Sequence, residues 1–320
     1  MVLTDTAEKI KKMEIRGAGR IARAAVTALR DHADNISTDD LPLFIAAMHD
    51  AAGTLIGTRP TAVSLPNAIH VVMHSLEEAG TLKEARSRFR VSCDDFIRSS
   101  EEAVERIGSI GSRHIRDGFV ILTHCNSEAA LACIIDAHRD GREITVYATE
   151  VRPGNQGLLT IRRLNDAGIR TRFIVDSAVR FFINEVDLVV VGADAVAVNG
   201  AVVNKIGTSQ IALAAHESRT RLMVAAETYK FAPRTILGEL ITLEERPGSE
   251  ILPDEIARQL PFVTVRNPVF DVTPPEYIDL IVTEQGAIPP QMAYSIIRDY
   301  LGWGMEEFHK EFRIHSTEQE

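Results

Sequence analysis

Two features of the 320-residue sequence predict an α/β fold: a helical pattern fills the first third, and the pattern changes near residue 118. Up to about residue 112, apolar residues recur at spacings of three and four, as on one face of a helix. Further on, short apolar runs alternate with helical segments, which is typical of a parallel sheet covered on both faces. We therefore predict a helical N-terminal domain over 1–115 and a Rossmann-like C-terminal domain with a mostly parallel sheet over 116–320.

The helical pattern of the first domain runs through several stretches. The first, "AEKIKKMEIRGAGRIARAAVTALRDHAD", is interrupted by Gly17 and Gly19. Three more follow it, namely "LPLFIAAMHDAAGTLIGT", "PNAIHVVMHSLEEA" and "DDFIRSSEEAVERIGSIGSRHI". Their apolar spacing predicts amphipathic helices that pack on one another.

The second domain should contain short buried strands separated by helices such as 127–139, 156–167 and 205–217. The expected strands are 119–124, 144–150, 172–176, 188–194, 221–227 and 278–284. In such sheets, ligands bind beyond the carboxyl ends of the strands. The residues at those ends can carry chemistry: His124, Cys125, Glu150, Asp176, Asp194, Glu227, Thr228 and Glu284. For Asp176 and Glu284, a role in capping the next turn is an equal alternative.

Composition excludes several classes of function. The formal charge of −10 is spread along the chain without a basic block, which argues against nucleic acid as a partner. The three cysteines lack CxxC spacing and the histidines lack ligand spacing, so we expect no metal and a reducing cytoplasm. Since no run of about 18 apolar residues occurs, we also expect no membrane span.

The segment "RGAGR", which holds Arg16, Gly17, Ala18 and Gly19, could bind an anion. Glycine lets backbone N–H groups approach an anion, and arginine adds paired donors that suit phosphate. The segment is not GxGxxG and follows no strand, so a dinucleotide cofactor is not indicated. A plain connection between helices explains it equally well. Arg59 could likewise bind an anionic substrate or form a surface ion pair.

The stretch "VVVGADAVAVNGAVVNKIGTSQIA" is the most informative. A strand ends at Asp194, a hairpin-like excursion follows, and Asn204 and Lys205 are expected to open a helix. A helix N-terminus with a lysine beside it suits a phosphate group, through free N–H groups and the positive charge. Lys230, beyond the next strand, could add positive charge, although a single lysine is more often solvated.

These motifs, with "THCNS" and "NPVFDVTPPEYIDLIVTEQG", resemble a superfamily. It unites regulatory subunits of the translation-initiation exchange factor 2B with two families of sugar-phosphate isomerases. The resemblance spans about residues 8 to 305 and implies a dimer that can assemble into a hexamer, without a cofactor. It also implies Cys125 and Asp194 as the catalytic pair. The substrate contacts that it implies are Arg16, Gly17, Ala18, Gly19, Arg59, Asn204, Lys205 and Lys230.

Within this superfamily the motifs are most similar to archaeal ribose-1,5-bisphosphate isomerases, which implies formation of ribulose 1,5-bisphosphate in AMP catabolism. Methylthioribose-1-phosphate isomerase is the first alternative, although its usual "RGAP" and "NGDVANKIGTY" stand here as "RGAG" and "NGAVVNKIGTS". A non-catalytic regulatory subunit of translation initiation is the second alternative. Such a subunit has no need of both Cys125 and Asp194, so the pair favours an enzyme.

The implied reaction moves hydrogen from C2 to C1 and releases the ring oxygen, which requires a base and an acid. Cys125 directly precedes a helix, whose dipole should lower the thiol pKa and favour a thiolate base. Asp194 would be the acid, protonated because burial raises a carboxyl pKa. "RGAG" with Arg59 would hold one phosphate, and Asn204, Lys205 and Lys230 the other, with the N-terminal helices closing over the strand ends. A direct hydride shift stays open as an alternative to proton transfer.

Overall fold

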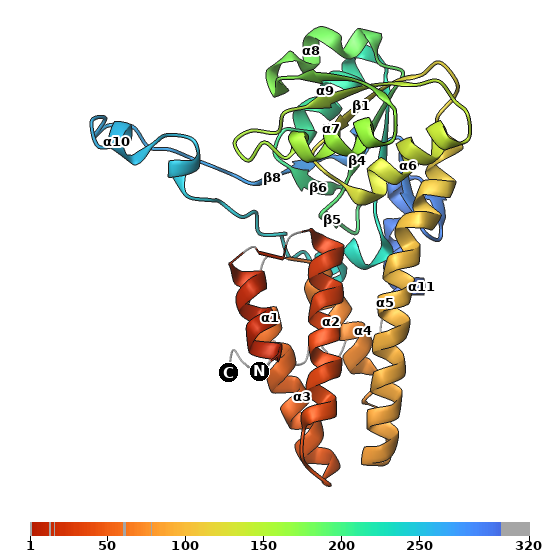
Figure 1. Ribbon diagram of the computed structural model, residues 1–320, viewed down its shortest axis with the longest axis vertical. Coiled ribbons are helices and arrows are strands. Elements are labelled where there is room, and N and C mark those ends of the chain that lie inside the picture. The colour runs from red at the N-terminus through yellow and green to blue at the C-terminus, as the bar shows by residue number, and fades with distance from the viewer. Residues whose placement is uncertain (1, 13, 16, 60–61, 78, 302–320) are drawn as a thin grey trace. The chain divides into compact units, whose positions relative to one another are not determined.

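The computed structural model describes residues 2–12, 14–15, 17–59, 62–77 and 79–301 (Figure 1). The chain forms two compact units. The helical unit holds the residues up to Ala103 together with Tyr229–Phe231, and the sheet unit holds Val104–Thr228 and the chain from Ala232 onward. The division falls inside a long helix, whereas the sequence analysis placed the domain boundary at 115, just after that helix.

The helical unit is built from amphipathic helices that share one apolar core. Their bounds are α1 (Val2–Lys11), α2 (Ala18–Asn35), α3 (Leu41–Ile56), α4 (Ser64–His74) and α5 (Leu82–Ser112). Asp40 caps α3 by accepting a hydrogen bond from the Leu43 N–H at 2.9 Å. Leu29, Phe44 and Phe89 are fully buried in the core. The helical pattern of α5 was expected only from about residue 94, because its first turns carry mostly polar side chains.

The larger sheet has seven strands within the described residues, in the order β10-β9-β7-β4-β1-β2-β3. Only β10 is antiparallel to its neighbour there. The prediction of an α/β fold with a mostly parallel sheet is confirmed. The strands are β1 (Val120–His124), β2 (Thr145–Thr149), β3 (Arg170–Ile174), β4 (Leu188–Gly192), β7 (Arg221–Ala225), β9 (Leu280–Thr283) and β10 (Gly286–Ile288). The helices between and after them are α6 (Glu128–Arg139), α7 (Gly157–Asp166), α8 (Val179–Phe182), α9 (Thr208–Ser218) and α11 (Ala293–Tyr300).

The strand order reverses between β1 and β4. From β1 the chain proceeds outward through β2 to β3, then returns to the other side of β1 and proceeds through β4, β7 and β9. The chain leaves β1 toward α6 and leaves β4 toward β5, so the carboxyl ends of these two strands form the point at which sheets of this kind bind ligands. The candidate site lies there.

A small antiparallel sheet follows β4. It consists of β5 (Ala195–Val196), β6 (Val202–Lys205) and β8 (Phe270–Thr273), with β6 in the middle. The expected hairpin-like excursion is thus β5 and β6. The expectation that Asn204 and Lys205 open a helix is wrong, because both are paired in β6 and α9 begins at Thr208.

Between β7 and β8 the chain forms an arm over residues 238–268, which carries the short helix α10 (Asp254–Ala257). Figure 1 shows α10 well apart from the strands of the same unit. Several large apolar side chains on this arm face solvent, among them Leu240 at 92% and Phe262 at 99% exposure. An apolar surface of this kind is typical of a segment that contacts another chain.

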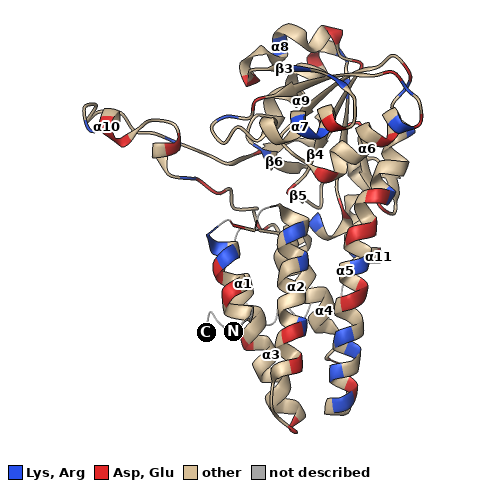
Figure 2. Cartoon of the chain, viewed as in Figure 1, with Lys and Arg blue, Asp and Glu red and all other residues tan. Residues whose placement is uncertain are grey.

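Charge is mixed over both units, as Figure 2 shows for the acidic and basic residues along α5. This distribution agrees with the modest net charge of the sequence and leaves recognition to local groups of side chains. Among the residues that the structure describes, no helix is both long enough and apolar enough to cross a bilayer.

Candidate active site at the carboxyl ends of β1 and β4

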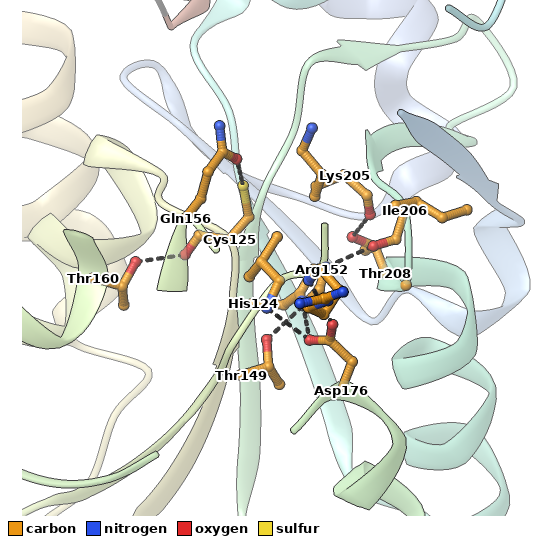
Figure 3. Close-up of polar contacts among 12 residues, drawn as sticks. His124, Cys125, Thr149, Arg152, Gln156, Thr160, Asp176, Lys205, Ile206 and Thr208 are labelled. Atoms are coloured by element: carbon orange, nitrogen blue, oxygen red, sulfur yellow. Dashed lines mark hydrogen bonds and ion pairs between the residues drawn. The ribbon is translucent and has the colours of Figure 1, made fainter. Parts of the chain in front are cut away.

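Cys125 directly follows β1 and has a left-handed backbone conformation, with φ of 67°. Such a conformation is costly for a residue with a side chain and tends to persist where function needs it. The turn directs the thiol toward the loop before α7, where Sγ donates a hydrogen bond to Gln156 Oε1 at 2.9 Å. The Thr160 hydroxyl donates to the Cys125 carbonyl at 2.6 Å and so fixes the backbone of the turn (Figure 3).

Asp194 follows the adjacent strand. His124 pairs with Val191 across β1 and β4, so Cys125 follows beside Gly192, two residues before Asp194, and Asp194 is close enough to raise the pKa of the Cys125 thiol. The Asp194 N–H donates to Val203 O at 2.9 Å, which ties its backbone to β6. Asp194 is half-buried. The structure therefore brings together the two residues for which the sequence predicted a joint role.

Glycine at position 192 permits this arrangement. A Cβ there would lie 2.3 Å from Ser127 Oγ and 2.5 Å from Ser127 Cβ. Ser127 is the N-cap of α6 and accepts a hydrogen bond from the Ala130 N–H at 3.2 Å. The loop that carries Cys125 can thus lie directly against the end of β4 only because Gly192 has no side chain.

The pKa of the Cys125 thiol is raised to about 11, mainly by burial, and the carboxylates of Asp194 and Asp176 contribute to this rise when they are ionised. The positive charge of Lys205 and the backbone N–H of Asn126 oppose this rise without outweighing it. The expectation of a lowered thiol pKa is wrong for the free protein, because desolvation exceeds the effect of the following helix. Cys125 is a thiol at neutral pH, which agrees with its role as donor to Gln156.

We expect alkylation of Cys125 by iodoacetamide to accelerate about tenfold per pH unit from pH 7 to 10, since only the thiolate reacts. Mass spectrometry of peptides sampled over time measures this rate. Cys93 and Cys133 serve as internal controls, because both are fully buried and should stay unmodified in the folded protein. A rate that reaches its plateau near pH 8 would show that the thiol pKa is close to its ordinary value.

Asn204 and Lys205 are the last two residues of β6, about ten residues after Asp194 in the sequence. The Asn204 amide donates to Thr208 Oγ1 at 3.0 Å, and the Thr208 hydroxyl donates to Lys205 O at 2.6 Å. The ammonium group of Lys205 lies 5.0 Å from the centre of the Phe270 ring. Figure 3 shows the side chain of Lys205, at the end of β6, and that of Gln156, the N-cap of α7, extending in the same direction.

The N-terminus of α9 is already occupied by a carboxylate. Asp271 of β8 accepts hydrogen bonds from the N–H groups of Gly207 at 2.8 Å and Ser209 at 3.1 Å. The sequence analysis expected these N–H groups to hold a phosphate. In this structure they bind Asp271, so Lys205 offers a phosphate its side chain rather than the helix terminus.

The helical unit holds a second group of predicted residues. Gly17, with φ of 91°, is the N-cap of α2, and Ala18 and Gly19 form its first turn. The Ser64 hydroxyl at the start of α4 donates to Ala18 O at 3.4 Å, which brings this turn close to the segment after α3 that carries Arg59. Arg59 is half-buried. Arg16 lies outside the described residues.

Lys230 belongs to this second group, although the sequence analysis placed it with Asn204 and Lys205. Its segment packs in the helical unit, and Lys230 itself is 7% exposed. The Asn67 amide of α4 donates to Tyr229 O at 2.9 Å and to Phe231 O at 2.7 Å, the two carbonyls that flank Lys230. Both hydrogens of one amide nitrogen thus fix the backbone of this lysine.

Sequence reasoning missed Gln156, Asn67 and Asp271. Gln156 stands in "RPGNQG", where the glycines and the proline indicated only a turn. Among the described residues, no group of three or more His, Cys, Asp or Glu side chains could hold a metal ion.

Comparison with known proteins defines the class. Residues 14–290 match the Initiation factor 2 subunit family, and the chain belongs to that family. Two solved members share its fold. Translation initiation factor eIF-2B of Pyrococcus horikoshii OT3 has a TM-score of 0.76 at 32% identity, covering 90% of this chain and 97% of that one. The 5-methylthioribose 1-phosphate isomerase of the same organism has a TM-score of 0.73 at 30% identity, covering 93% and 86%.

Within the family, curated relatives narrow the assignment. Ribose 1,5-bisphosphate isomerase of Methanocaldococcus jannaschii is 53% identical, covering 94% of this chain and 96% of the relative. The enzyme of the same name from Archaeoglobus fulgidus is 54% identical, covering 95% of each. Methylthioribose-1-phosphate isomerase of Acetivibrio thermocellus is 36% identical, covering 89% and 88%. The resemblance to archaeal ribose-1,5-bisphosphate isomerases is confirmed.

Proposed function

We propose that this protein is an aldose–ketose isomerase that converts ribose 1,5-bisphosphate to ribulose 1,5-bisphosphate. The observation that carries the proposal is the pair Cys125 and Asp194 at the carboxyl ends of adjacent strands, with Lys205 close enough to affect the thiol. The relatives that carry this enzyme name are also more similar to the chain than those named methylthioribose-1-phosphate isomerase. The latter activity is the second candidate, because the corresponding fold matches over most of both chains.

The proposed reaction balances with one base and one acid. Removal of the C2 proton and cleavage of the bond between C1 and the ring oxygen, with a proton delivered to that oxygen, give an enol. Return of a proton to C1 and loss of the C2 hydroxyl proton then complete the ketose. We assign removal of the C2 proton to Cys125 and protonation of the ring oxygen to Asp194.

Since Cys125 is a thiol in the free protein, this assignment requires the thiol to lose its proton after substrate binds. Two neighbours favour that step. The positive charge of Lys205 lowers the pKa of Cys125. Gln156 accepts a hydrogen bond from the thiol, and the same amide, once rotated, offers an N–H donor to a thiolate.

Each phosphate of the substrate is assigned to one of two sets of basic, polar and glycine residues. We propose that Lys205 and Asn204 of the sheet unit hold one phosphate. The other phosphate would be held by the second set, which consists of Arg16, Gly17, Ala18, Gly19, Arg59 and Lys230. This division is supported by the placement of Lys230 in the helical unit, beside the helix that also contacts Ala18.

Purified protein mixed with ribose 1,5-bisphosphate should form ribulose 1,5-bisphosphate, detected by a coupled carboxylase assay or by NMR. Ribose 5-phosphate and methylthioribose 1-phosphate, which each lack one phosphate, should react at least 100-fold less efficiently, because an unpaired charged site costs binding energy. Faster conversion of methylthioribose 1-phosphate would select the second candidate. No conversion of any of the three would favour a non-catalytic subunit of translation initiation.

We further propose that the protein acts in the cytoplasm as a homodimer or as a hexamer built from three dimers. The exposed apolar residues of the arm over 238–268, including Leu240 and Phe262, support association with a second chain. Light scattering at micromolar concentration measures the oligomeric state, and a monomer alone would contradict the proposal.

A further inference from the structure

The peptide bond between Ile206 and Gly207 follows Lys205 and is held from both sides. The carbonyl of Ile206 accepts a hydrogen bond from His124 Nε2 at 2.9 Å. The N–H of Gly207 donates to Asp271 Oδ2 at 2.8 Å. One partner thus comes from β1 and the other from β8, so strands far apart in the sequence fix the orientation of this one peptide (Figure 3 shows the His124 side).

The imidazole of His124 has one allowed arrangement in this network. The Ile206 carbonyl can only accept, so Nε2 carries the hydrogen. Burial lowers the pKa of His124, with only 1% of the residue exposed, and the ring is neutral. Nδ1 is then an acceptor and takes the hydrogen of Thr149 Oγ1, which lies 2.6 Å away. Thr149 at the end of β2 thus fixes the orientation of the His124 ring at the end of β1, and this ring in turn binds the Ile206 carbonyl.

Two charged side chains near the ring, Asp176 and Lys205, shift the pKa of His124 in opposite directions. Asp176 Oδ1 lies 3.9 Å from Nδ1, and the charge of Asp176 raises the pKa of His124. The Asp176 carboxylate also accepts from the N–H groups of Val151 at 2.9 Å and Arg152 at 2.8 Å. Lys205 opposes Asp176 by lowering the pKa of the imidazole.

Gly207 allows the turn to approach the ring. Its φ of 103° lies in the region that favours glycine, and a Cβ would lie 3.1 Å from His124 Cε1 and 3.2 Å from Nε2. A side chain at 207 would therefore strain the backbone and press on the imidazole at the same time.

Asp271 holds the other side of the Ile206–Gly207 peptide, and we call His124 and Asp271 together the clamp. Besides Gly207, its Oδ2 binds the N–H of Ser209, so it fixes the first turn of α9 as well. Asp271 is also the residue of β8 that pairs with Asn204 of β6. Burial raises the pKa of Asp271 to about 6, while the two backbone N–H groups oppose that rise.

We propose that His124 and Asp271 are positioning residues that fix the turn after Lys205 and thereby hold its ammonium group at one place relative to Cys125. This role rests on the proposed function, in which Lys205 binds a substrate phosphate. His124 is also the residue directly before Cys125, so a single ring sets the distance between the thiol and the turn that carries the lysine. Neither side chain needs to touch the substrate.

Two substitutions remove the clamp from opposite sides: His124→Leu and Asp271→Ala. Each should raise KM for ribose 1,5-bisphosphate about tenfold, because a displaced lysine weakens the phosphate contact. Each should also lower kcat, because the displaced lysine no longer favours loss of the Cys125 proton. Hydrogen exchange of the full-length protein, followed by mass spectrometry, should show at least tenfold faster exchange of the peptide covering 206–210. Exchange in the α2 and α3 peptides should not change.

Conservative variants separate positioning from general damage. His124→Gln places an amide N–H near the position of Nε2 and should restore most of the KM and the exchange protection. Asp271→Asn keeps an oxygen acceptor for the two N–H groups and should do the same. Wild-type KM and exchange in both His124→Leu and Asp271→Ala would overturn the proposal. If the wild-type protein proves inactive on all sugars, the exchange measurement still decides whether the clamp exists.

Discussion

Replacement of Cys125 by serine or of Asp194 by asparagine is expected to lower kcat for ribose 1,5-bisphosphate by about 10²–10⁴, the usual cost of losing one positioned acid or base. A serine hydroxyl is a far weaker acid than a thiol, and asparagine keeps the shape of aspartate without a transferable proton. KM should change little, because contacts to the phosphates supply most of the binding energy. Steady-state kinetics on each variant measures both parameters.

Cys133→Ser is the matched control. Cys133 lies on α6 in the core of the sheet unit, and its thiol donates to backbone carbonyls of Ile107 at 3.4 Å and Ala129 at 3.3 Å. The hydroxyl of serine can do the same, so this variant should keep kcat and lose only some stability. Equal kcat in Cys125→Ser and the wild type would refute the assignment of the base.

Gly157→Ala is expected to have the largest effect on stability, lowering the free energy of unfolding by about 3 kcal/mol and abolishing most activity. A Cβ at this position would lie 2.0 Å from the carbonyl oxygen of Thr149 and 3.0 Å from the backbone of Glu150. These atoms belong to the end of β2 and its continuation, which cannot move without breaking the pairing with β1 and β3. Displacement of α7 would also remove Gln156 from Cys125.

Gly154→Ala provides the control within the same loop. No atom lies within 4 Å of the place where its Cβ would be, so this variant should match the wild type within about 0.5 kcal/mol. Urea denaturation followed by circular dichroism gives both values. If Gly157→Ala is as stable as Gly154→Ala, the close packing of α7 against β2 does not constrain this site.

The position of Cys125 could be predicted because it depends on a local pattern. An apolar run that stops at "THCNS" ends a parallel strand, and the fold places ligands at such ends. The same reasoning located Asp194 and gave six strands of the large sheet to within a few residues, but it missed the short antiparallel strand β10. The apolar repeat of about 3.6 residues in a helix and about 2 residues in a strand involves only neighbouring side chains, so a single sequence is enough to find it.

Other parts of the site depend on pairs of residues far apart in the chain. Asp271 reaches the N-terminus of α9 only because β8 pairs with β6. No pattern of neighbouring residues in the sequence predicts that pairing. Lys230 joins the helical unit because Asn67 binds the carbonyls on either side of it. The raised pKa of Cys125 has the same origin, since burial is a property of the assembled fold and outweighs the nearby helix.

The return of the chain to the helical unit at Tyr229–Phe231 has a consequence for how this protein could have evolved. Tyr229 packs against Phe96, with ring centres 5.7 Å apart, and its hydroxyl accepts from Ser100 Oγ at 3.3 Å. The N-terminal helices are therefore not a module that recombination could exchange by cutting the gene once. A replacement set of helices would have to pack around three residues encoded more than a hundred codons downstream.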